Sequence, residues 1–560
     1  MATIPRPEYP RPQFVRPDWL CLNGPWQFEI DHNDEGLARG MRDRELSGTI
    51  TVPFCPESSL SGVGHAGFMD AVWYRRAIDV PRAWAGRRVL LWFQAVDYDA
   101  TVWADGVEVA RHVGGYTPFA CDLGDAAGRT VTVVVRARDN PRVVKPRGKQ
   151  CPKRDNTGCL YTRTTGIWQT VWLEPVPLAC RLDRPRLWPD MAGSRFVLEQ
   201  PLVGGTPLVA STTAEGFTLR AVLRDDRGEV SRAECDAGAD FAPRLDLPVP
   251  ADRRRLWSPD DPHLYDLNIE LTDAAGHVVD RATSYAGLRG ITLDGPAVKL
   301  NGRAVFQRLV LDQGFYPDGI YTAPTDEALR RDIRLAMAAG FNGARLHEKV
   351  FEERFFYHAD RLGYLVWGEF PDWGSQADVG AQDQGQRPTP AYVRQWIEVL
   401  RRDLSHPSIV GWCPMNETAE ACGDRPTALD DATWAMWLAA KAADPTRPVL
   451  DTSGYSHRVP ESDVYDSHDY DQDPAAFKAR HDGLLRGEPF VNLWDGRTMS
   501  IPWNGQPYFV SEFGGPWWYA DTASEPTAWG YGDRLESVEA FYTRFKALCD
   551  VLLDLSLIHI

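Results

Sequence analysis

The sequence predicts three successive domains: a jelly-roll β-sandwich, an immunoglobulin-like β-sandwich and a (β/α)₈ TIM barrel that lacks its last strand. A chain of 560 residues exceeds what one hydrophobic core usually holds. Up to about residue 289, short β-branched and aromatic runs alternate with turn residues, and helical periodicity is nearly absent. Beyond about residue 290, strands alternate with amphipathic helices, which is typical of an α/β domain.

The first predicted domain covers residues 1–177. Val89–Phe93, Tyr98–Trp103 and Thr130–Arg136 are strand-like runs, and dipeptides such as Asp105-Gly106 mark the turns between them. This pattern favours an antiparallel sandwich of the jelly-roll type.

The second predicted domain covers residues 178–289. Phe217–Leu223 and Leu264–Leu271 alternate apolar and polar side chains with period two, on either side of a loop rich in Pro and Asp. A stretch of about this length with such strands suits a small immunoglobulin-like sandwich.

The third predicted domain covers residues 290–560. Thr325 is a good N-cap, Leu329, Ile333 and Met337 recur every four residues, and Gly340 ends the predicted helix. The same alternation of strand and helix continues along the chain and indicates a barrel. The predicted strands lie at Ala304–Leu311, Gly343–His347, Tyr364–Glu369, Ser408–Cys413, Arg447–Asp451, Asp463–Tyr465 and Pro507–Glu512.

A full barrel needs an eighth strand after the last amphipathic helix, which we predict at about 535–550. The chain instead ends in the apolar run Leu555–Ile560, with no turn residue before it. We interpret the chain as truncated and the last six residues as foreign. The alternative is that this run is itself the eighth strand.

Composition excludes several classes of protein. The 78 acidic and 61 basic residues give a formal charge of −17, which disfavours nucleic acids and anionic membranes as partners. The ten cysteines form no CxxC pair, and we interpret them as buried reduced thiols. No signal peptide and no apolar run of membrane-spanning length is evident. We therefore expect a cytoplasmic protein with a neutral, polar substrate; the sequence does not fix its oligomeric state, and a homo-oligomer is compatible with it.

Two carboxylates close predicted strands on opposite sides of the barrel mouth. Glu417 follows the fourth strand and Glu512 closes the seventh. Facing carboxylates of this kind can cleave a glycosidic bond, one as a general acid and one as a nucleophile. Spacing alone leaves open that each is an ordinary solvated loop residue.

Several sequence motifs favour the catalytic interpretation of the two carboxylates, because they occur in the same order along the chain as the motifs of a known family. The chain resembles glycoside hydrolase family 2 along most of its length. In the first predicted domain the resemblance rests on Leu22–Phe28, Val52–Phe54, Trp73–Arg75 and Gly166–Glu174. In the predicted barrel it rests on Phe341–His347, Asp360–Pro371 and Arg402–Glu417.

The resemblance implies a retaining β-glycosidase, with Glu417 as general acid/base and Glu512 as nucleophile. Glu417 must hold a proton near neutral pH, so we expect burial or the charge of Glu512 to raise its pKa. Glu512 must stay ionised, and Arg345 is a suitable hydrogen-bond donor to it. We expect Asn416 to contact the sugar 2-hydroxyl, and His347 either to donate to another hydroxyl or to orient a carboxylate.

Aromatic side chains near the strand ends could stack on the apolar face of a sugar ring, although each could equally pack beneath a loop. These candidates are Trp373, Tyr470, Trp517 and Trp518. Polar candidates of the same kind are Asp451, His468 and Asp469.

The third-strand segment also differs from that of the metal-dependent β-galactosidases in the family. It reads Glu369–Gly374 where those enzymes carry an Ile-Glu-Thr-His-Gly-like segment, so we expect no metal and no cofactor. We expect a β-galactosidase-like exo-activity first and β-glucuronidase next. The alternative from another functional class is a carbohydrate-binding protein without catalysis.

Overall fold

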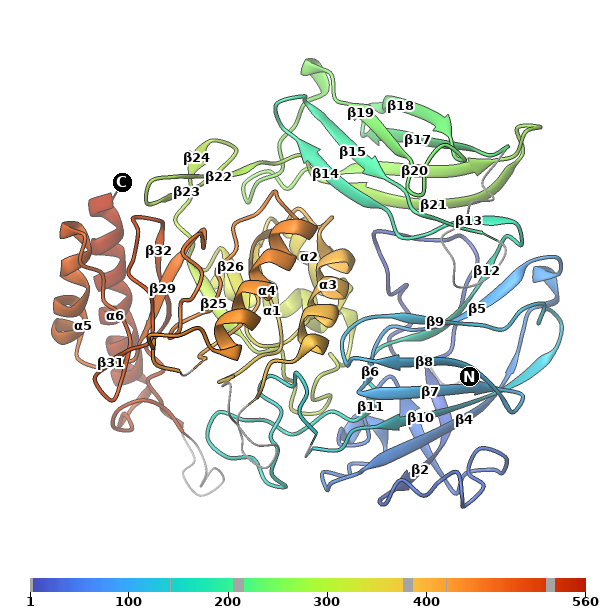
Figure 1. Ribbon diagram of the computed structural model, residues 1–560, viewed down its shortest axis with the longest axis horizontal. Helices are drawn as coiled ribbons and strands as arrows, with labels where there is room; N and C mark the ends of the chain where they lie inside the picture. Colours follow the sequence, from blue (N-terminus) through green and yellow to red (C-terminus); the bar gives the residue numbers. More distant parts are fainter. Residues whose placement is uncertain are drawn as a thin grey trace.

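The computed structural model arranges the chain as two β-rich regions beside an α/β region (Figure 1). The first β-rich region is blue to cyan, the second is green, and the α/β region runs from yellow-green to red. The structure describes residues 4–141, 143–204, 216–375, 386–418, 420–519 and 529–559, with side chains described as far as residue 555.

The first β-rich region consists of two antiparallel sheets that share one core. Val131, Val133 and Val135 alternate along β10 and pack in the same buried cluster as Leu91 and Phe93 of β5 in the other sheet. One sheet has the order β3 (Gly48–Val52), β2 (Gly24–Asp31), β4 (Ala71–Asp79), β10 (Thr130–Arg138), β7 (Asp99–Ala104) and β8 (Val107–Val113). The other has the order β1 (Leu20–Cys21), β12 (Val171–Val176), β5 (Arg88–Phe93) and β9 (Phe119–Asp122), and β6 (Val96–Asp97) pairs with β11 (Gly166–Ile167).

The second β-rich region encloses its own core. Alternate residues of β17 and β20, among them Leu219 and Leu267, are buried there as the period-two pattern predicts. Its main sheet has the order β18 (Gly228–Asp236), β17 (Thr218–Asp225), β20 (Tyr265–Thr272) and β21 (Val278–Ala286). The remaining strands are β14 (Arg186–Asp190), β15 (Arg195–Glu199) and β19 (Arg244–Pro248) in one sheet, and β13 (Cys180–Leu182) with β16 (Leu202–Gly204).

The α/β region begins with a small antiparallel sheet and continues as a TIM barrel domain of parallel strands. The small sheet comprises β22 (Ile291–Asp294), β23 (Ala297–Leu300) and β24 (Arg303–Ala304). The first parallel strand, β25 (Leu309–Asp312), therefore starts later than predicted, because Ala304 pairs with Lys299 in the small sheet. The next strands are β26 (Gly343–Leu346), β27 (Leu365–Glu369) and β28 (Ile409–Cys413).

The fifth predicted strand is a segment near Val449 that pairs with β28 through isolated parallel bridges. Next to it lie the parallel strands β29 (Tyr465–Asp469) and β32 (Tyr508–Phe513). Among the described residues, no strand follows β32. The chain ends instead in α6, which includes the described part of Leu555–Ile560, so the alternative of a strand there is wrong.

Six helices accompany the parallel strands in the described ranges. Thr325 caps α1 as predicted, since its hydroxyl accepts a hydrogen bond from the Ala328 amide at 3.1 Å. None of these helices is both long and apolar enough to cross a membrane. They are α1 (Asp326–Ala338), α2 (Glu353–Leu362), α3 (Pro390–Asp403), α4 (Ala428–Ala443), α5 (Pro474–His481) and α6 (Val538–His559). A hairpin of β30 (Leu493–Trp494) and β31 (Arg497–Thr498) precedes β32, and short 3₁₀ turns lie at Ser59–Ser61, Arg82–Trp84, Ala251–Arg253 and Asp482–Arg486.

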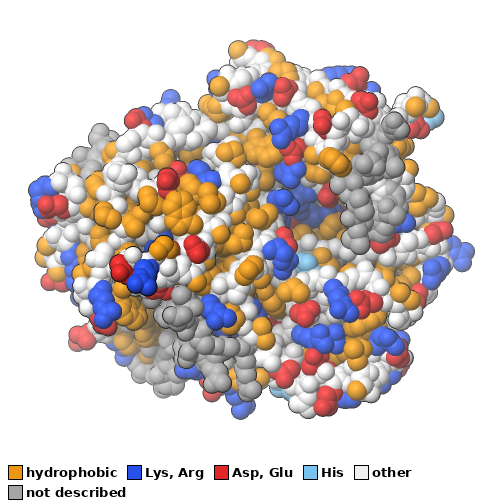
Figure 2. Space-filling view, in the orientation of Figure 1, with side chains coloured by type: hydrophobic (Ala, Val, Ile, Leu, Met, Phe, Trp, Pro, Cys, Tyr) orange, Lys and Arg blue, Asp and Glu red, His pale blue; other side chains and the backbone are white. Residues whose placement is uncertain are grey.

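Charged side chains of both signs are interspersed on the face seen in Figure 2. On that face, the acidic excess of the sequence does not gather into one extended patch.

A loop of the first β-rich region reaches the barrel mouth. The Gly148 amide donates to the Pro371 carbonyl oxygen at 2.9 Å, just after β27. Gly148 has φ +53°, and a Cβ atom there would lie 2.1 Å from the Glu348 carbonyl oxygen. This close approach requires glycine, and it brings the residues after Gly148 beside the strand ends.

The buried carboxylate of Asp360, in α2, joins the barrel to the second β-rich region. It accepts from the Tyr285 hydroxyl at 2.8 Å and from the Ser408 amide at 2.9 Å, and its Oδ2 lies 2.6 Å from His406 Nδ1. The Trp257 indole donates to the Asp360 carbonyl oxygen at 2.7 Å. One side chain thus satisfies polar groups from both regions.

We predict that Asp360→Ala lowers the free energy of unfolding by about 3 to 5 kcal/mol, because it leaves the buried Tyr285 hydroxyl, Ser408 amide and His406 ring without their carboxylate partner. Denaturant unfolding followed by tryptophan fluorescence measures the loss. Glu327→Ala is the control, because its ion pair with Arg330 is exposed and should contribute at most about 1 kcal/mol. Equal stability of the two variants would contradict the role of the Asp360 carboxylate in holding the barrel to the second β-rich region.

Candidate active site

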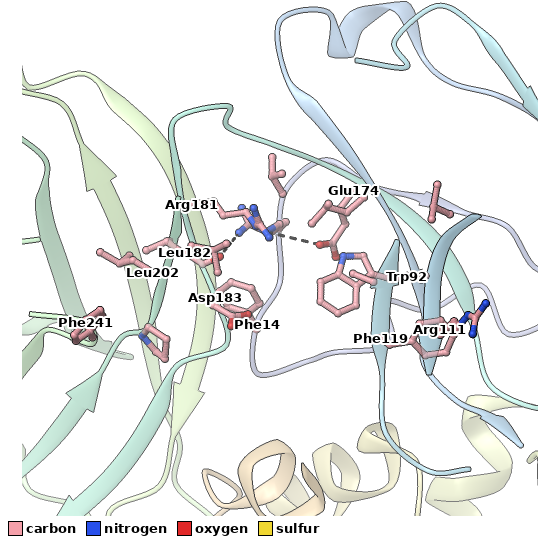
Figure 3. Close-up of a pocket in the computed structure, with 18 residues that line it drawn as sticks. Phe14, Trp92, Arg111, Phe119, Glu174, Arg181, Leu182, Asp183, Leu202 and Phe241 are labelled. Carbon is pink, nitrogen blue, oxygen red and sulfur yellow. Dashed lines mark hydrogen bonds and ion pairs between the residues drawn. The ribbon is translucent and has the colours of Figure 1, made fainter. Parts of the chain in front are cut away.

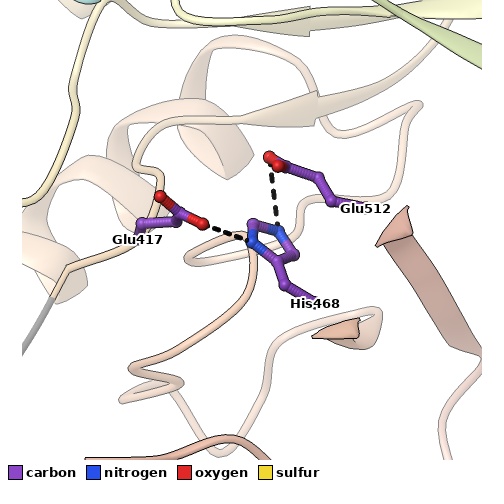
Figure 4. A group of neighbouring side chains, drawn as sticks. All are labelled: Glu417, His468 and Glu512. Carbon is purple, nitrogen blue, oxygen red and sulfur yellow. Dashed lines mark hydrogen bonds and ion pairs between the residues drawn. The ribbon is translucent and has the colours of Figure 1, made fainter. Parts of the chain in front are cut away.

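Three side chains from successive parts of the barrel meet at its mouth (Figure 4). Glu417 follows β28, His468 lies in β29 and Glu512 lies in β32. One side-chain oxygen of each glutamate and one imidazole nitrogen all lie within 4.8 Å of one another. The sequence-predicted pair Glu417 and Glu512 is therefore brought together, with the imidazole between them.

Glu417 is held on both carboxylate oxygens. Its Oε1 lies 2.8 Å from His468 Nδ1 and 3.2 Å from the Tyr470 hydroxyl oxygen. Its Oε2 accepts from the Trp373 indole at 2.9 Å. The Glu417 backbone has φ +48°, in the left-handed region, and its amide donates to the Ser453 carbonyl oxygen at 2.9 Å. These contacts fix the direction of the carboxylate.

Glu512 receives donors of a different kind. The Arg345 guanidinium donates to its Oε1, and the Tyr470 hydroxyl donates to its Oε2. The ring of Tyr470 stacks on Tyr531 with centroids 3.8 Å apart. A cation and a phenol thus stabilise the ionised form of Glu512.

Arg345, in β26, links Glu512 to two further polar groups. Its Nη1 donates to Glu369 Oε2 at 2.6 Å and to Asn416 Oδ1 at 3.2 Å. The Asn416 amide in turn donates to Glu348 Oε1 at 2.8 Å. A buried guanidinium therefore organises the floor of the site.

Burial shifts the pKa values of the other titratable groups on the floor of the site. It raises the pKa of Glu369 to about 7, although Arg345 opposes the shift. Burial also raises the pKa of Glu348 well above its ordinary value. The pKa of His347 is lowered well below its ordinary value by burial and by the charge of Arg345. His347 Nε2 lies 3.1 Å from Glu348 Oε1, and the two alternatives for its role stay predictions.

The sequence-based prediction of a raised pKa for Glu417 is wrong, because the structure gives a lowered pKa. Burial alone would raise it, but the hydrogen bond and charge of His468, with help from Lys149 and Trp373, outweigh burial and lower it to about 2. The pKa of His468 is raised, since Glu512 and Glu417 outweigh its burial. These opposite shifts favour an ion pair in which the imidazole carries the proton.

Some predicted residues lie apart from this cluster. Among the described contacts, the Trp517 indole donates to the Gly532 carbonyl oxygen at 3.0 Å, and none joins Trp517 or Trp518 to either glutamate. Asp451 pairs with His457, and Asp469 pairs with Arg480. These two acids support the loops around the site.

Sequence reasoning missed four neighbours of the glutamates. Lys149 Nζ lies 3.5 Å from Glu348 Oε1 and 4.2 Å from the centre of the Trp373 ring. Lys149 is remote in sequence, and only the fold brings it here. Glu369 ends one predicted strand and Glu348 directly follows another, which was an available signal, whereas Tyr531 stood in no recognisable pattern.

The same three ligand atoms of Glu417, His468 and Glu512 could hold a metal ion. The 2.8 Å contact between His468 and Glu417 and the ring of donors around Glu512 account for their closeness as a hydrogen-bonded group.

A separate cavity of about 590 Å³ lies between the two β-rich regions (Figure 3). It is lined by aromatic and charged side chains that include Phe14, Trp92, Phe241, Arg181 and Glu174. Neither glutamate of the barrel lines it. The cavity is therefore separate from the cluster of Glu417, His468 and Glu512.

Comparison with known proteins agrees with this geometry. The model of the family described as "Glycosyl hydrolases family 2" matches residues 209–289, and its TIM barrel domain model matches residues 322–480. The comparisons support membership of glycoside hydrolase family 2. Glu417 and His468 lie within the matched barrel segment.

Curated proteins from bacteria and mammals are similar to this chain. A β-glucuronidase of Paenibacillus borealis is 27% identical over 463 residues, covering 76% of this chain and 72% of that protein. A β-glucuronidase of Canis lupus familiaris is 28% identical, with 76% and 67% covered. A β-galactosidase of Bacteroides ovatus is 26% identical, with 72% and 47% covered.

Solved structures of two β-glucuronidases share the fold. The β-glucuronidase of Ruminococcus gnavus in complex with D-glucuronic acid superposes with a TM-score of 0.72 at 19% identity, covering 98% of this chain and 90% of that chain. The Dictyoglomus thermophilum β-D-glucuronidase gives a TM-score of 0.72 at 17% identity, with 97% and 89% covered.

We predict that Arg345→Gln destabilises the protein by about 3 to 5 kcal/mol at pH 8, because Glu369 and Glu512 lose their buried cation. The pKa of Glu369, which burial already raises to about 7, should then rise further above its value in the unfolded chain. The folded state would bind more protons than the unfolded state, so stability should recover as the pH falls from 8 to 6.

Thermal unfolding at both pH values measures this effect, with Arg345→Lys as the control that keeps the charge. A loss of stability in Arg345→Gln that does not change with pH would contradict the electrostatic role of Arg345.

Proposed function

We propose that the protein is a retaining exo-β-glycosidase that releases terminal β-linked sugars by double displacement. The observation that carries this proposal is the closeness of the Glu417 and Glu512 carboxylate oxygens, which lie within 4.8 Å of each other. Retaining enzymes hold their two carboxyl groups about 5 to 5.5 Å apart, whereas inverting enzymes need about 6.5 to 9.5 Å to admit a water. The separation here leaves room for direct attack by a carboxylate.

We assign Glu512 as the nucleophile. Its carboxylate would attack the anomeric carbon and form a glycosyl ester as the bond to the leaving oxygen breaks. The donors Arg345 and Tyr470 support this role, because both favour the ionised carboxylate.

We assign Glu417 as the general acid and base. In the first step it would give a proton to the leaving oxygen, and in the second it would take a proton from the water that attacks the ester. The Trp373 indole on its Oε2 holds the carboxylate in one orientation. Asn416 donates one amide hydrogen to Glu348, and we propose its second amide hydrogen for the sugar 2-hydroxyl.

We propose β-glucuronides as the first substrates to test and β-galactosides as the second. The sequence alone put the β-galactosidase-like activity first. The β-glucuronidases of Paenibacillus borealis and Canis lupus familiaris each align with 76% of this chain, and the β-galactosidase of Bacteroides ovatus aligns with 72%. The names of these relatives support the reversed order.

The first prediction is that the chain hydrolyses one member of a panel of nitrophenyl β-glucuronide, β-galactoside, β-mannoside and α-arabinoside. Glu512→Ala should abolish the turnover, since no carboxylate remains to form the ester. Glu461→Ala, which removes an exposed carboxylate, should retain it. Turnover in Glu512→Ala at the rate of the parent chain would refute the assignment, and sugar binding without any turnover would favour a carbohydrate-binding protein.

A second prediction separates the roles of the two glutamates. Glu417→Ala should lower kcat/KM by about 10²- to 10⁴-fold on a methyl glycoside, because the leaving alkoxide needs a proton. The loss should be much smaller on a dinitrophenyl glycoside, whose leaving group departs unprotonated. Steady-state kinetics on both substrates measures the difference, and equal losses would count against Glu417 as the acid.

A further inference from the structure

His468 lies between the two glutamates, and the double-displacement scheme gives it no task. Its side chain is 1% exposed. Its Nδ1 lies 2.8 Å from Glu417 Oε1, and its Nε2 lies 3.5 Å from Glu512 Oε1 (Figure 4). The ring thus contacts the proposed acid with one nitrogen and faces the proposed nucleophile with the other.

A buried network fixes the proton on Nε2. The Ser453 hydroxyl donates to Asp466 Oδ2 at 3.0 Å, so its oxygen is free to accept from His468 Nε2 at 3.0 Å. His457 stabilises the negative charge of Asp466, because its Nε2 lies 3.0 Å from Asp466 Oδ1. Its Nδ1 lies 2.8 Å from Asp451 Oδ1. Nε2 therefore donates, and Nδ1 is the nitrogen that can exchange a proton.

Packing keeps the ring in this position. Gly454 has φ +92°, and a Cβ atom there would lie 2.6 Å from His468 Cε1. The backbone of Gly454 therefore lies directly against the imidazole, and its amide donates to Asp466 Oδ1 at 2.8 Å. The His468 ring, confined in this way, can gain or lose a proton while it keeps its position.

We propose that His468 stores the proton that Glu417 delivers, so that the two side chains act as one acid/base unit. This inference rests on the proposed function and adds a positioning residue to it. In the first step the proton passes from His468 Nδ1 to Glu417 and on to the glycosidic oxygen, while the anomeric C–O bond breaks and Glu512 forms the ester. In the second step water attacks the anomeric carbon, the ester bond to Glu512 breaks, and the proton from water returns through Glu417 to Nδ1. One water is consumed, and the pair ends as it began.

The electrostatics of the site agree with storage on the imidazole. The pKa of His468 is raised chiefly by the charges of Glu512 and Glu417, which oppose its burial, and the pKa of Glu417 is lowered chiefly by His468. Because the two groups are coupled, the stored proton should be lost with one apparent pKa that belongs to the pair. The titratable or charged groups that face His468 are Glu417, Glu512, Asp466, Tyr470, Tyr455, Arg345 and His347.

The first test needs no substrate. Nitrogen-15 NMR of labelled histidine, with the His468 signal assigned from His468→Asn, reports the protonation of each ring nitrogen. We expect both nitrogens of His468 to be protonated at pH 7 in the parent chain. In Glu417→Gln the Nδ1 proton should be lost at a pH at least one unit lower, while the signals of His457 stay unchanged. A neutral His468 at pH 7, or the same titration in Glu417→Gln, would overturn the inference.

The second test follows the reaction once the substrate panel has supplied a substrate. In His468→Asn the basic limb of the kcat/KM profile should move at least one unit to lower pH, because Glu417 alone releases its proton earlier. The exposed His277→Asn should leave the profile unchanged. A uniform loss of kcat with an unmoved basic limb would assign His468 a structural role only. A silent panel would count against the proposed function and leave the NMR result to decide the inference.

Discussion

The guanidinium of Arg345 is the interaction on which the rest of the site depends. It is buried beneath the barrel mouth and donates to Glu369, Asn416 and Glu512, each from a different part of the barrel. Carboxylates this close would otherwise take up protons to relieve their repulsion. Arg345 therefore places a buried cation beside Glu512, the carboxylate that we propose as the nucleophile.

The two glutamates differ because their surroundings differ. Glu512 faces a permanent cation and a phenol, whereas Glu417 faces an imidazole that can itself gain or lose a proton. In glycosidases, one carboxyl group acts as acid and the other as nucleophile because their environments give them different pKa values. The first β-rich region completes the site from outside the barrel, because Gly148 permits the close approach that brings Lys149 to Glu348.

The sequence predicted the elements that local patterns determine. The period-two strands, the Thr325 cap and the strands ending near Glu417 and Glu512 follow from neighbouring residues, and the family motifs marked those two glutamates. What it could not supply depends on distant contacts. Lys149 reaches the site only through the packing of two regions, and the place of His468 between the glutamates follows from the pairing of β29 with β32. The fall in the Glu417 pKa follows from that same pairing.

The stereochemistry of the first product tests the central claim most directly. Proton NMR recorded during hydrolysis of the substrate found in the panel distinguishes the β from the α anomer before the sugar mutarotates. Attack by Glu512 followed by attack of water inverts the anomeric carbon twice, so the account predicts the β anomer first. The α anomer as the first product would mean that water attacks directly, and would contradict the assignment of Glu512 as nucleophile.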